Sequence, residues 1–302
     1  MKKKIFVYLC ALAGMFAACD DMTDQPQADD GIQGGALLET GTAEMYILSE
    51  GLFNLNNSTL ARYSFSKGTW TPNWFYAMNR RDLGDTANDM DVYGSKLYVV
   101  VNVSSTVEVI NLADGKVLQQ ISLVDENGAS RQPRAVAFHE GKAYVCSFDG
   151  TVARIDTTTL QVDTLTRVGR NPEDLCVQDG KLYVSNSGGL DWEGIGVDRT
   201  VSVVDLQSFR EIRKIEVGPN PGRILPGPDH TVYVATYGAQ IEKGDYHLVC
   251  IDTRKDEVKV RYDEPVTEFA INDRLAYIYT FDYQRQEASI KVFDLGSGKV
   301  QR

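Results

Sequence analysis

The sequence carries few residues that could act as catalytic acids, bases or nucleophiles. Its three histidines are His139, His230 and His247, and histidine is the side chain that most often transfers protons in enzymes. Two of them adjoin predicted tight turns, and the third ends a predicted loop. The motifs of nucleophilic serine hydrolases, zinc proteases and phosphate-binding loops do not occur in the sequence. We therefore predict a binding protein that is not an enzyme, with no catalytic residues and no cofactor.

Four carboxylates could gather near one point of the fold, namely Asp85, Asp89, Glu173 and Asp174. Calcium prefers such oxygen ligands. Their spacing matches neither an EF-hand nor the calcium-binding nonapeptide repeat. We therefore interpret them as solvated loop ends and predict no metal site, with a cation site as the alternative.

Cysteine usage indicates neither a disulfide framework nor a metal site. Cys146, Cys176 and Cys250 each lie in a short apolar run, and their number is odd and without CxxC spacing. This pattern favours buried free thiols. The formal net charge of −11 also argues against a nucleic-acid partner, because phosphate binding needs a basic surface.

The N-terminus has the features of a lipoprotein signal peptide. Three lysines at positions 2–4 precede the apolar run Ile5–Ala18, which is too short to span a bilayer. The small residues directly before Cys19 resemble a bacterial lipobox, which implies cleavage there and lipidation of Cys19; an ordinary secretory signal is the alternative. We therefore predict a signal peptide over residues 1–18 and a lipidated cysteine with an acidic flexible tether over residues 19–42.

Residues 43–302 contain an internal repeat. An apolar-Tyr-apolar segment recurs six times at spacings of 39 to 52 residues, with its tyrosines at Tyr46, Tyr98, Tyr144, Tyr183, Tyr233 and Tyr277. Each copy is followed by a second strand, which ends in Asp or Asn in five of the six copies, and then by further short β-type runs. Four antiparallel strands per unit predict an all-β fold, a β-propeller of four-stranded blades.

Counting strands gives six recognisable blades. The first, with an outer strand predicted over residues 70–77, lacks its innermost strand, the next four are complete, and the last stops after its third strand. No run shows a convincing helical period.

In a propeller of four-stranded blades, the loops after the second and fourth strands of each blade share one face, which we call the long-loop face. Six polar or aromatic residues there are predicted to bind a ligand: Asn102, Arg134, Arg170, Asn186, Trp192 and Tyr237.

The unit from Asn171-Pro172 to Gly218, with Lys181-Leu182-Tyr183-Val184 in its middle, resembles the YncE or YVTN-type propeller repeat. The resemblance implies seven blades in the complete family fold, so the chain either lacks a terminal blade or closes with six. Fold likeness of this kind says little about function, because propellers serve many chemistries.

Longer stretches resemble the surface propeller lipoproteins of the Bacteroides group, which are DUF5074-like, and among them the BtuG type. They include Leu83–Met90, Val152–Thr158 and Val168–Glu173. The acidic pair Asp20-Asp21 after Cys19 also resembles the signal that sends such lipoproteins to the outer face of the outer membrane; a periplasmic location is the alternative.

The BtuG type implies a function for this chain. It would capture a corrinoid, vitamin B12, and pass it to a TonB-dependent outer-membrane transporter, with the lipid anchor as its only membrane contact. The alternative is a glycan- or protein-binding adhesion module, and a propeller lyase or hydrolase is third.

Overall fold

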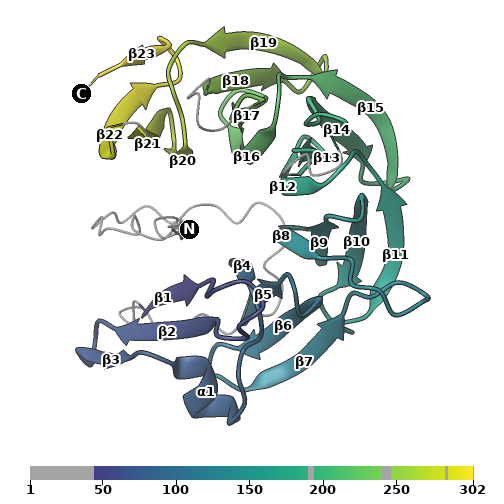
Figure 1. Cartoon of the computed structure of the whole chain (residues 1–302), viewed down its shortest axis with the longest axis vertical. Helices are drawn as coiled ribbons and strands as arrows, with labels where there is room; N and C mark the ends of the chain where they lie inside the picture. Colours follow the sequence, from purple (N-terminus) through teal and green to yellow (C-terminus); the bar gives the residue numbers. More distant parts are fainter. Residues whose placement is uncertain (1–43, 190–193, 240–245, 283–284, 302) are drawn as a thin grey trace, which may run out of the picture.

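The computed structural model describes residues 44–189, 194–239, 246–282 and 285–301. This part of the chain forms six antiparallel sheets and one short helix, which confirms the predicted all-β propeller. The sheets follow one another around an arc as six blades, and the arc is open between the first and the last blade (Figure 1). No helix in the described residues is long and apolar enough to cross a bilayer.

Every blade is a meander in which strands consecutive in sequence pair antiparallel. The first three blades contain β1 (Glu44–Ser49), β2 (Thr59–Ser64) and β3 (Thr69–Thr71); β4 (Ala87–Tyr93), β5 (Lys96–Val101), β6 (Thr106–Asn111) and β7 (Val117–Ser122); β8 (Pro133–His139), β9 (Lys142–Ser147), β10 (Thr151–Asp156) and β11 (Val162–Arg167). The last three contain β12 (Pro172–Gln178), β13 (Lys181–Asn186), β14 (Thr200–Asp205) and β15 (Arg210–Glu216); β16 (Pro221–Gly227), β17 (Thr231–Thr236), β18 (His247–Asp252) and β19 (Glu257–Tyr262); β20 (Glu268–Asn272), β21 (Leu275–Asp282), β22 (Glu287–Asp294) and β23 (Lys299–Val300).

The strand count agrees with the prediction in the first five blades and differs in the sixth. The first blade has three strands and no innermost one, and the next four blades have four each. In the last blade the sequence predicts three strands, but a short fourth strand, β23, pairs with β22 through Val300 opposite Phe293. A two-residue strand lies below the length at which alternation can be recognised in a sequence.

Helix α1 (Trp74–Asn79) corrects the strand predicted over residues 70–77. Asn73 ends the strand pattern because its side chain caps the helix, accepting a hydrogen bond from the Tyr76 N–H at 3.2 Å. Arg80 closes the helix in a left-handed conformation with φ 59°. Trp74 and Phe75 are buried against the second blade. Six residues are too few for a helical period to be visible in the sequence.

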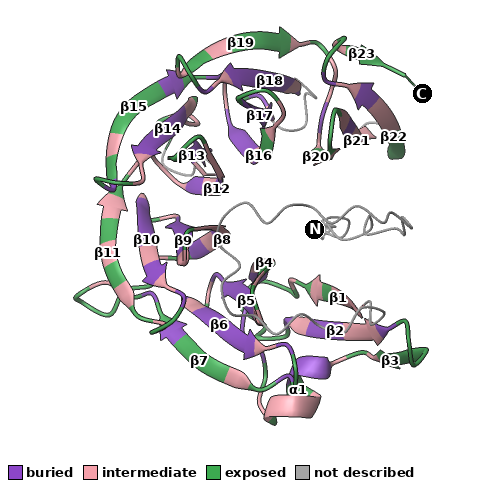
Figure 2. Cartoon of the chain, turned by 180° about the vertical axis from the view of Figure 1, so that it is seen from behind, coloured by how far each residue is buried: buried purple, intermediate pink, exposed green. Residues whose placement is uncertain are grey.

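The hydrophobic core lies between blades. Five clusters of buried residues each join two neighbouring blades, from the first pair to the last. The repeated tyrosines of the middle blades lie within these interfaces, with Tyr98 and Tyr183 fully buried. The second and third strands of blades two to five are therefore largely buried, and their outermost strands are largely exposed (Figure 2). A single blade cannot bury both of its faces alone, so the repeat stabilises itself by stacking.

In the last five blades, side-chain hydrogen bonds fix the turn that follows the third strand. As predicted, the Asp or Asn at the end of that strand accepts hydrogen bonds from the next turn. Asp156, for example, accepts from the Thr158 N–H at 2.9 Å and the Thr159 N–H at 2.8 Å.

The three cysteines of the propeller, Cys146, Cys176 and Cys250, are buried free thiols, as predicted, and burial raises the pKa of each of them.

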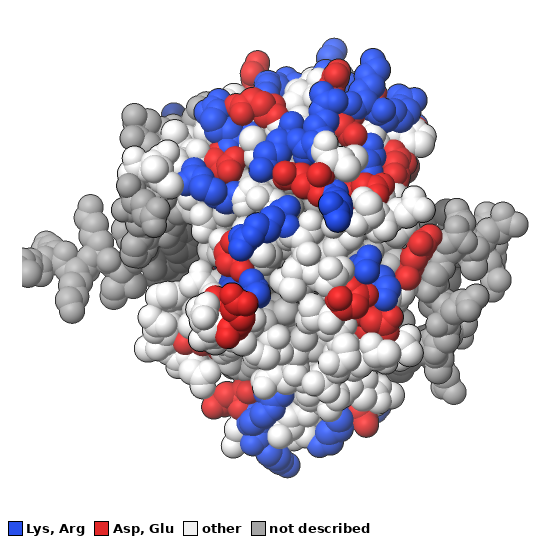
Figure 3. Space-filling view, turned by 90° about the vertical axis from the view of Figure 1, so that its right-hand side faces the viewer, with Lys and Arg blue, Asp and Glu red and all other residues white. Residues whose placement is uncertain are grey.

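Charges on the outer circumference are mixed in sign. Lys and Arg side chains are interspersed with Asp and Glu on the side of the molecule that Figure 3 shows. On β15, Arg213 approaches Glu257 of β19 to 3.6 Å and Lys214 approaches Glu211 to 3.4 Å. This side therefore offers no continuous basic stripe of the kind that binds nucleic acid.

Candidate functional site

Four innermost strands begin with the same backbone irregularity. The residue before each strand has a positive φ, and these residues are Thr86, Gln132, Asn171 and Asn220, with φ values of 61°, 54°, 43° and 55°. The pairing register of each strand then shifts within its first residues. Such a β-bulge turns side chains away from the regular sheet. The same backbone device therefore recurs at the start of each of these blades, on the long-loop face.

A backbone hydrogen bond holds each bulge in place. The residue that follows the second strand donates its N–H to the carbonyl of the positive-φ residue. The four bonds are Asn102 to Thr86 at 2.8 Å, Phe148 to Gln132 at 2.9 Å, Ser187 to Asn171 at 3.1 Å and Tyr237 to Asn220 at 3.0 Å. The two loops of the long-loop face are thus tied to each other in every one of these blades, as the predicted blade plan requires.

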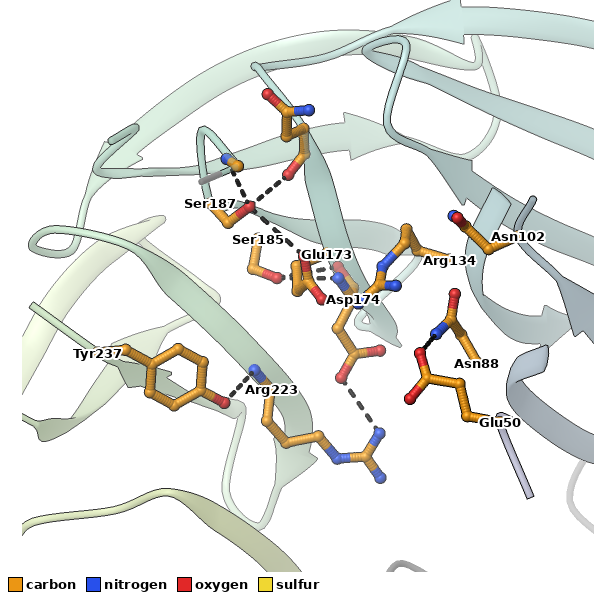
Figure 4. Close-up of polar contacts among 12 residues, drawn as sticks. Glu50, Asn88, Asn102, Arg134, Glu173, Asp174, Ser185, Ser187, Arg223 and Tyr237 are labelled. Carbon is orange, nitrogen blue, oxygen red and sulfur yellow. Dashed lines mark hydrogen bonds and ion pairs between the residues drawn. The ribbon is translucent and has the colours of Figure 1, made fainter. Parts of the chain in front are cut away.

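One side chain from each blade lies near the axis of the arc. We call this set the axial ring; in chain order it comprises Glu50, Asn88, Arg134, Glu173, Arg223 and Glu268. Glu50 follows β1, and the others lie within the first residues of innermost strands. The first five point toward one another in Figure 4, together with Asp174. The repeat therefore brings five polar side chains from five blades together, and Glu268 of the sixth blade is near enough to interact electrostatically with Arg223 and Asp174.

The first half of the axial ring is linked by hydrogen bonds and charge. Asn88 Nδ2 donates to Glu50 Oε1 at 2.6 Å, and Arg134 forms an ion pair with Glu173. The Arg134 guanidinium also lies over the Phe148 ring, 4.7 Å from its centroid. Burial opposes the charge of Arg134, but the carboxylates of Glu173 and Glu50 outweigh it and raise its pKa. Burial raises the pKa of Glu50, against the effect of Arg134.

The second half is centred on Arg223. Its Nη1 lies 3.2 Å from Asp174 Oδ2, and the same oxygen accepts the Ile224 N–H at 3.0 Å. Burial raises the pKa of Asp174 to about 6, although Arg223 lowers it. Glu268 is exposed, but surrounding protein reduces the hydration of its carboxyl and raises its pKa to about 7, again opposed by Arg223. Both groups therefore take up protons more readily than ordinary carboxyls.

The carboxylates considered for a cation have other partners. Asp89 Oδ2 accepts the Val136 N–H of the next blade at 2.9 Å, as Asp174 does for Ile224. Asp85 accepts backbone N–H groups of the loop after β1. Among the described residues, no group of three or more metal-ligating side chains is arranged to hold an ion. These carboxylates join blades and loops to one another.

Two of the six residues predicted to bind a ligand lie at the axial ring. Arg134 is a member of it, and Tyr237 borders it, since the Tyr237 hydroxyl accepts the Arg223 N–H at 3.2 Å. Gly222 makes this placement possible. A Cβ there would lie 2.2 Å from the Tyr237 ring, so the ring occupies space that a side chain at position 222 would need.

Three others hold the loops of the long-loop face. Asn102 Nδ2 donates to the Pro133 carbonyl at 3.0 Å, and Arg170 Nη2 donates to the Gly196 carbonyl at 2.6 Å. Asn186 is fully buried; its Oδ1 accepts the N–H of Gly169 in the loop before β12 at 3.1 Å, and its Nδ2 donates to Ser202 at 2.9 Å. Trp192 and the predicted lipidation site Cys19 lie outside the described residues.

The prediction missed Glu50, Asn88, Arg223 and Glu268, and it placed Glu173 only among the possible cation ligands. The sequence does carry a signal for the bulges. A proline follows the positive-φ residue in three blades, at Pro133, Pro172 and Pro221, and the bulge comes directly after it. Aligning the repeats on that proline would have identified Arg134, Glu173 and Gly222 as equivalent positions.

Six blades, the repeated bulge and the polar axial ring define a six-bladed β-propeller with a candidate binding site on its axis. The chain belongs to the family described as "Domain of unknown function (DUF5074)", whose model matches residues 43–281. No curated protein matches the chain.

Solved structures support the propeller fold. The hydrazine synthase of Kuenenia stuttgartiensis superposes with a TM-score of 0.57 at 17% identity, covering 71% of this chain and 64% of the other. The computationally designed Ika8 protein superposes with a TM-score of 0.56 at 13% identity, covering 85% and 70%. The chain thus spans somewhat less than two thirds of the hydrazine synthase chain. At these identities the likeness concerns the fold alone.

Proposed function

We propose that this chain captures a large neutral organic ligand at the axial ring, without chemically changing it. One observation carries the proposal. Three side chains of the ring have a buried polar atom with no hydrogen-bond partner among the described residues, namely Asn88 Oδ1, Arg134 Nε and Arg223 Nε. Buried polar groups are nearly always satisfied in folded proteins. A ligand with both donors and acceptors would satisfy these three groups from three different blades.

A corrinoid such as cobalamin is the ligand we propose. Its side arms are neutral amides, which both donate and accept hydrogen bonds. The axial ring offers carboxylates, guanidinium groups and an amide, and Tyr237 adds an aromatic surface beside them. The resemblance of the sequence to the BtuG type supplies the identity of the ligand.

We further propose that the protein acts at the outer membrane. In this proposal the acyl chains on Cys19 anchor it, its propeller faces the cell exterior, and it delivers the ligand to a TonB-dependent transporter. Metabolic labelling with a palmitate analogue should mark the wild type and not Cys19→Ala. Equal labelling of both would contradict lipidation at this cysteine. Protease treatment of intact cells should cleave the propeller, and full protection would place it in the periplasm.

Calorimetric titration of the detergent-purified full-length chain with cyanocobalamin tests the ligand directly. Arg134→Met should weaken binding by at least about 1 kcal/mol, because it removes a buried binding group. Arg213→Met is the matched control, since Arg213 lies on the outermost strand β15 and is exposed. If the wild type at micromolar concentration gave no heat of binding and no spectral change, the proposal that the ligand is a corrinoid would be refuted. A glycan- or protein-binding adhesion module would then be the function to test next.

A further inference from the structure

A loop beside the axial ring exposes three large apolar side chains. It joins β1 to β2 over residues 51–58, and we call it the apolar loop. Leu52, Phe53 and Leu55 are 53%, 67% and 59% exposed. No charged residue occurs between Glu50 and Arg62. Clustered exposed apolar side chains on a soluble domain commonly mark a binding surface.

Polar contacts fix the backbone of the apolar loop. The carboxylate of Asp85, which is itself buried, accepts the N–H of Asn54 at 3.1 Å and that of Asn56 at 2.9 Å. Ser58 Oγ accepts the Ala87 N–H at 3.0 Å. Both asparagines have positive φ, which this residue type tolerates well. The loop is therefore shaped without help from its apolar side chains, which leaves them directed to solvent.

The apolar loop is continuous with the axial ring at both of its attachments. Glu50 belongs to the ring and directly precedes the loop, and Asp85 lies three residues before Asn88 of the ring. Phe53 is three residues beyond Glu50, so their Cα atoms lie within about 11 Å of each other. A ligand large enough to contact several blades from the axis would also reach the loop.

We infer that the apolar loop is the hydrophobic part of the ligand site, and that Phe53 and Leu55 contact the apolar face of the ligand whose polar arms meet the axial ring. This inference rests on the proposed function. It makes the ligand an amphipathic molecule with one broad apolar face, as a corrinoid ring has. Because the loop is already ordered by Asp85, these contacts form without the cost of ordering a flexible segment.

The test compares Phe53→Ser and Leu55→Ser with Ile212→Ser in titrations with cyanocobalamin. Ile212 is a matched control because it is 56% exposed and lies on the outer strand β15. We expect each loop variant to bind at least about fivefold more weakly than the wild type, the loss typical of an anchoring residue. Ile212→Ser should bind like the wild type. All three should keep the wild-type Tm, since each replaced side chain is exposed.

The outcomes separate this inference from the proposed function. Binding that Arg134→Met weakens but the loop variants leave unchanged would overturn the inference and keep the function. Absence of binding by the wild type would overturn both. Unchanged binding together with a loss of self-association in Phe53→Ser, measured by analytical ultracentrifugation, would show that a second copy covers the loop, and it would also overturn the inference.

Discussion

Replacing Gly222 with alanine should expel the Tyr237 ring from the border of the axial ring. The added Cβ would lie 2.2 Å from Tyr237 Cε2 and 2.8 Å from its Cζ, far inside van der Waals contact. Position 222 carries no positive-φ strain of its own, so the steric clash is the cause of the effect. The Tyr237 hydroxyl accepts the N–H of Arg223 in the bulge, so the Tyr237 side chain cannot move away from the added Cβ without losing that hydrogen bond.

The expected cost follows from the two contacts that Tyr237 would lose. Its hydroxyl accepts the Arg223 N–H at 3.2 Å, and a hydrogen bond of this kind contributes about 0.5–1.5 kcal/mol. Its ring also meets Tyr246 edge-on at 6.1 Å between centroids, which contributes about 0.5–1.5 kcal/mol. Gly222→Ala should therefore lower the free energy of unfolding by about 1–3 kcal/mol. For a domain of this size that corresponds to a fall in Tm of roughly 2–12 °C.

A double-mutant cycle with urea denaturation tests this reasoning. In a Tyr237→Ala background, Gly222→Ala should cost almost nothing, because the ring that it would strike is gone. Gly296→Ala is the matched control, as a Cβ there meets nothing closer than 3.3 Å. An equal cost of Gly222→Ala with and without Tyr237 would refute the proposed clash.

Three further predictions concern other parts of the propeller. The pKa of Asp174 is raised from 3.8 to about 6, so the folded chain holds the extra proton between these values. This group alone should then lower the stability by up to about 3 kcal/mol as pH rises from 4 to 6. Urea denaturation across this range should show a smaller fall in Asp174→Asn than in the wild type, the remainder coming from other carboxyls such as Glu50 and Glu268, whose pKa values burial also raises; an equal fall in both would contradict the prediction. Arg81→Met should cost about 3 kcal/mol in the same assay, because it leaves the fully buried Glu108 carboxylate without its cation; a wild-type midpoint would contradict this. Asn73→Ala should cost about 1 kcal/mol through loss of the α1 cap, and an unchanged urea midpoint would show that the cap is dispensable.

The repeat made the blades predictable from the sequence. The recurring tyrosine strand and the terminal Asp or Asn mark two of the four strands in each of the last five units, and the structure has both where they were expected. The exceptions are short. Helix α1 and strand β23 contain six and two residues, and neither shows a period that a sequence can reveal.

The axial ring was less predictable because it depends on a bulge. A register shift moves a side chain out of the alternation on which sequence reading relies. Asn88 and Arg223 each end a predicted loop of the long-loop face, but nothing in the sequence shows that the bulge directs them toward the axis. Arg134 and Tyr237 were found because they stand in or beside the long loops. Asn186 was also selected on that ground, yet its amide bonds Ser202 of its own blade and Gly169 of the preceding loop, and it does not belong to the axial ring.

The bulge separates what holds the ring of blades together from what faces the axis. The backbone of the bulge is fixed by the positive-φ residue, whose carbonyl accepts the N–H of the residue that follows the second strand. Neither the positive φ nor this hydrogen bond involves the side chain of the bulge residue. That side chain accordingly differs from blade to blade, being Asn88, Arg134, Glu173 and then glycine at position 222. Since one scaffold can carry many such sets, membership of the family leaves the ligand undetermined. The chemistry of recognition must therefore be read from these positions and from the apolar loop beside them.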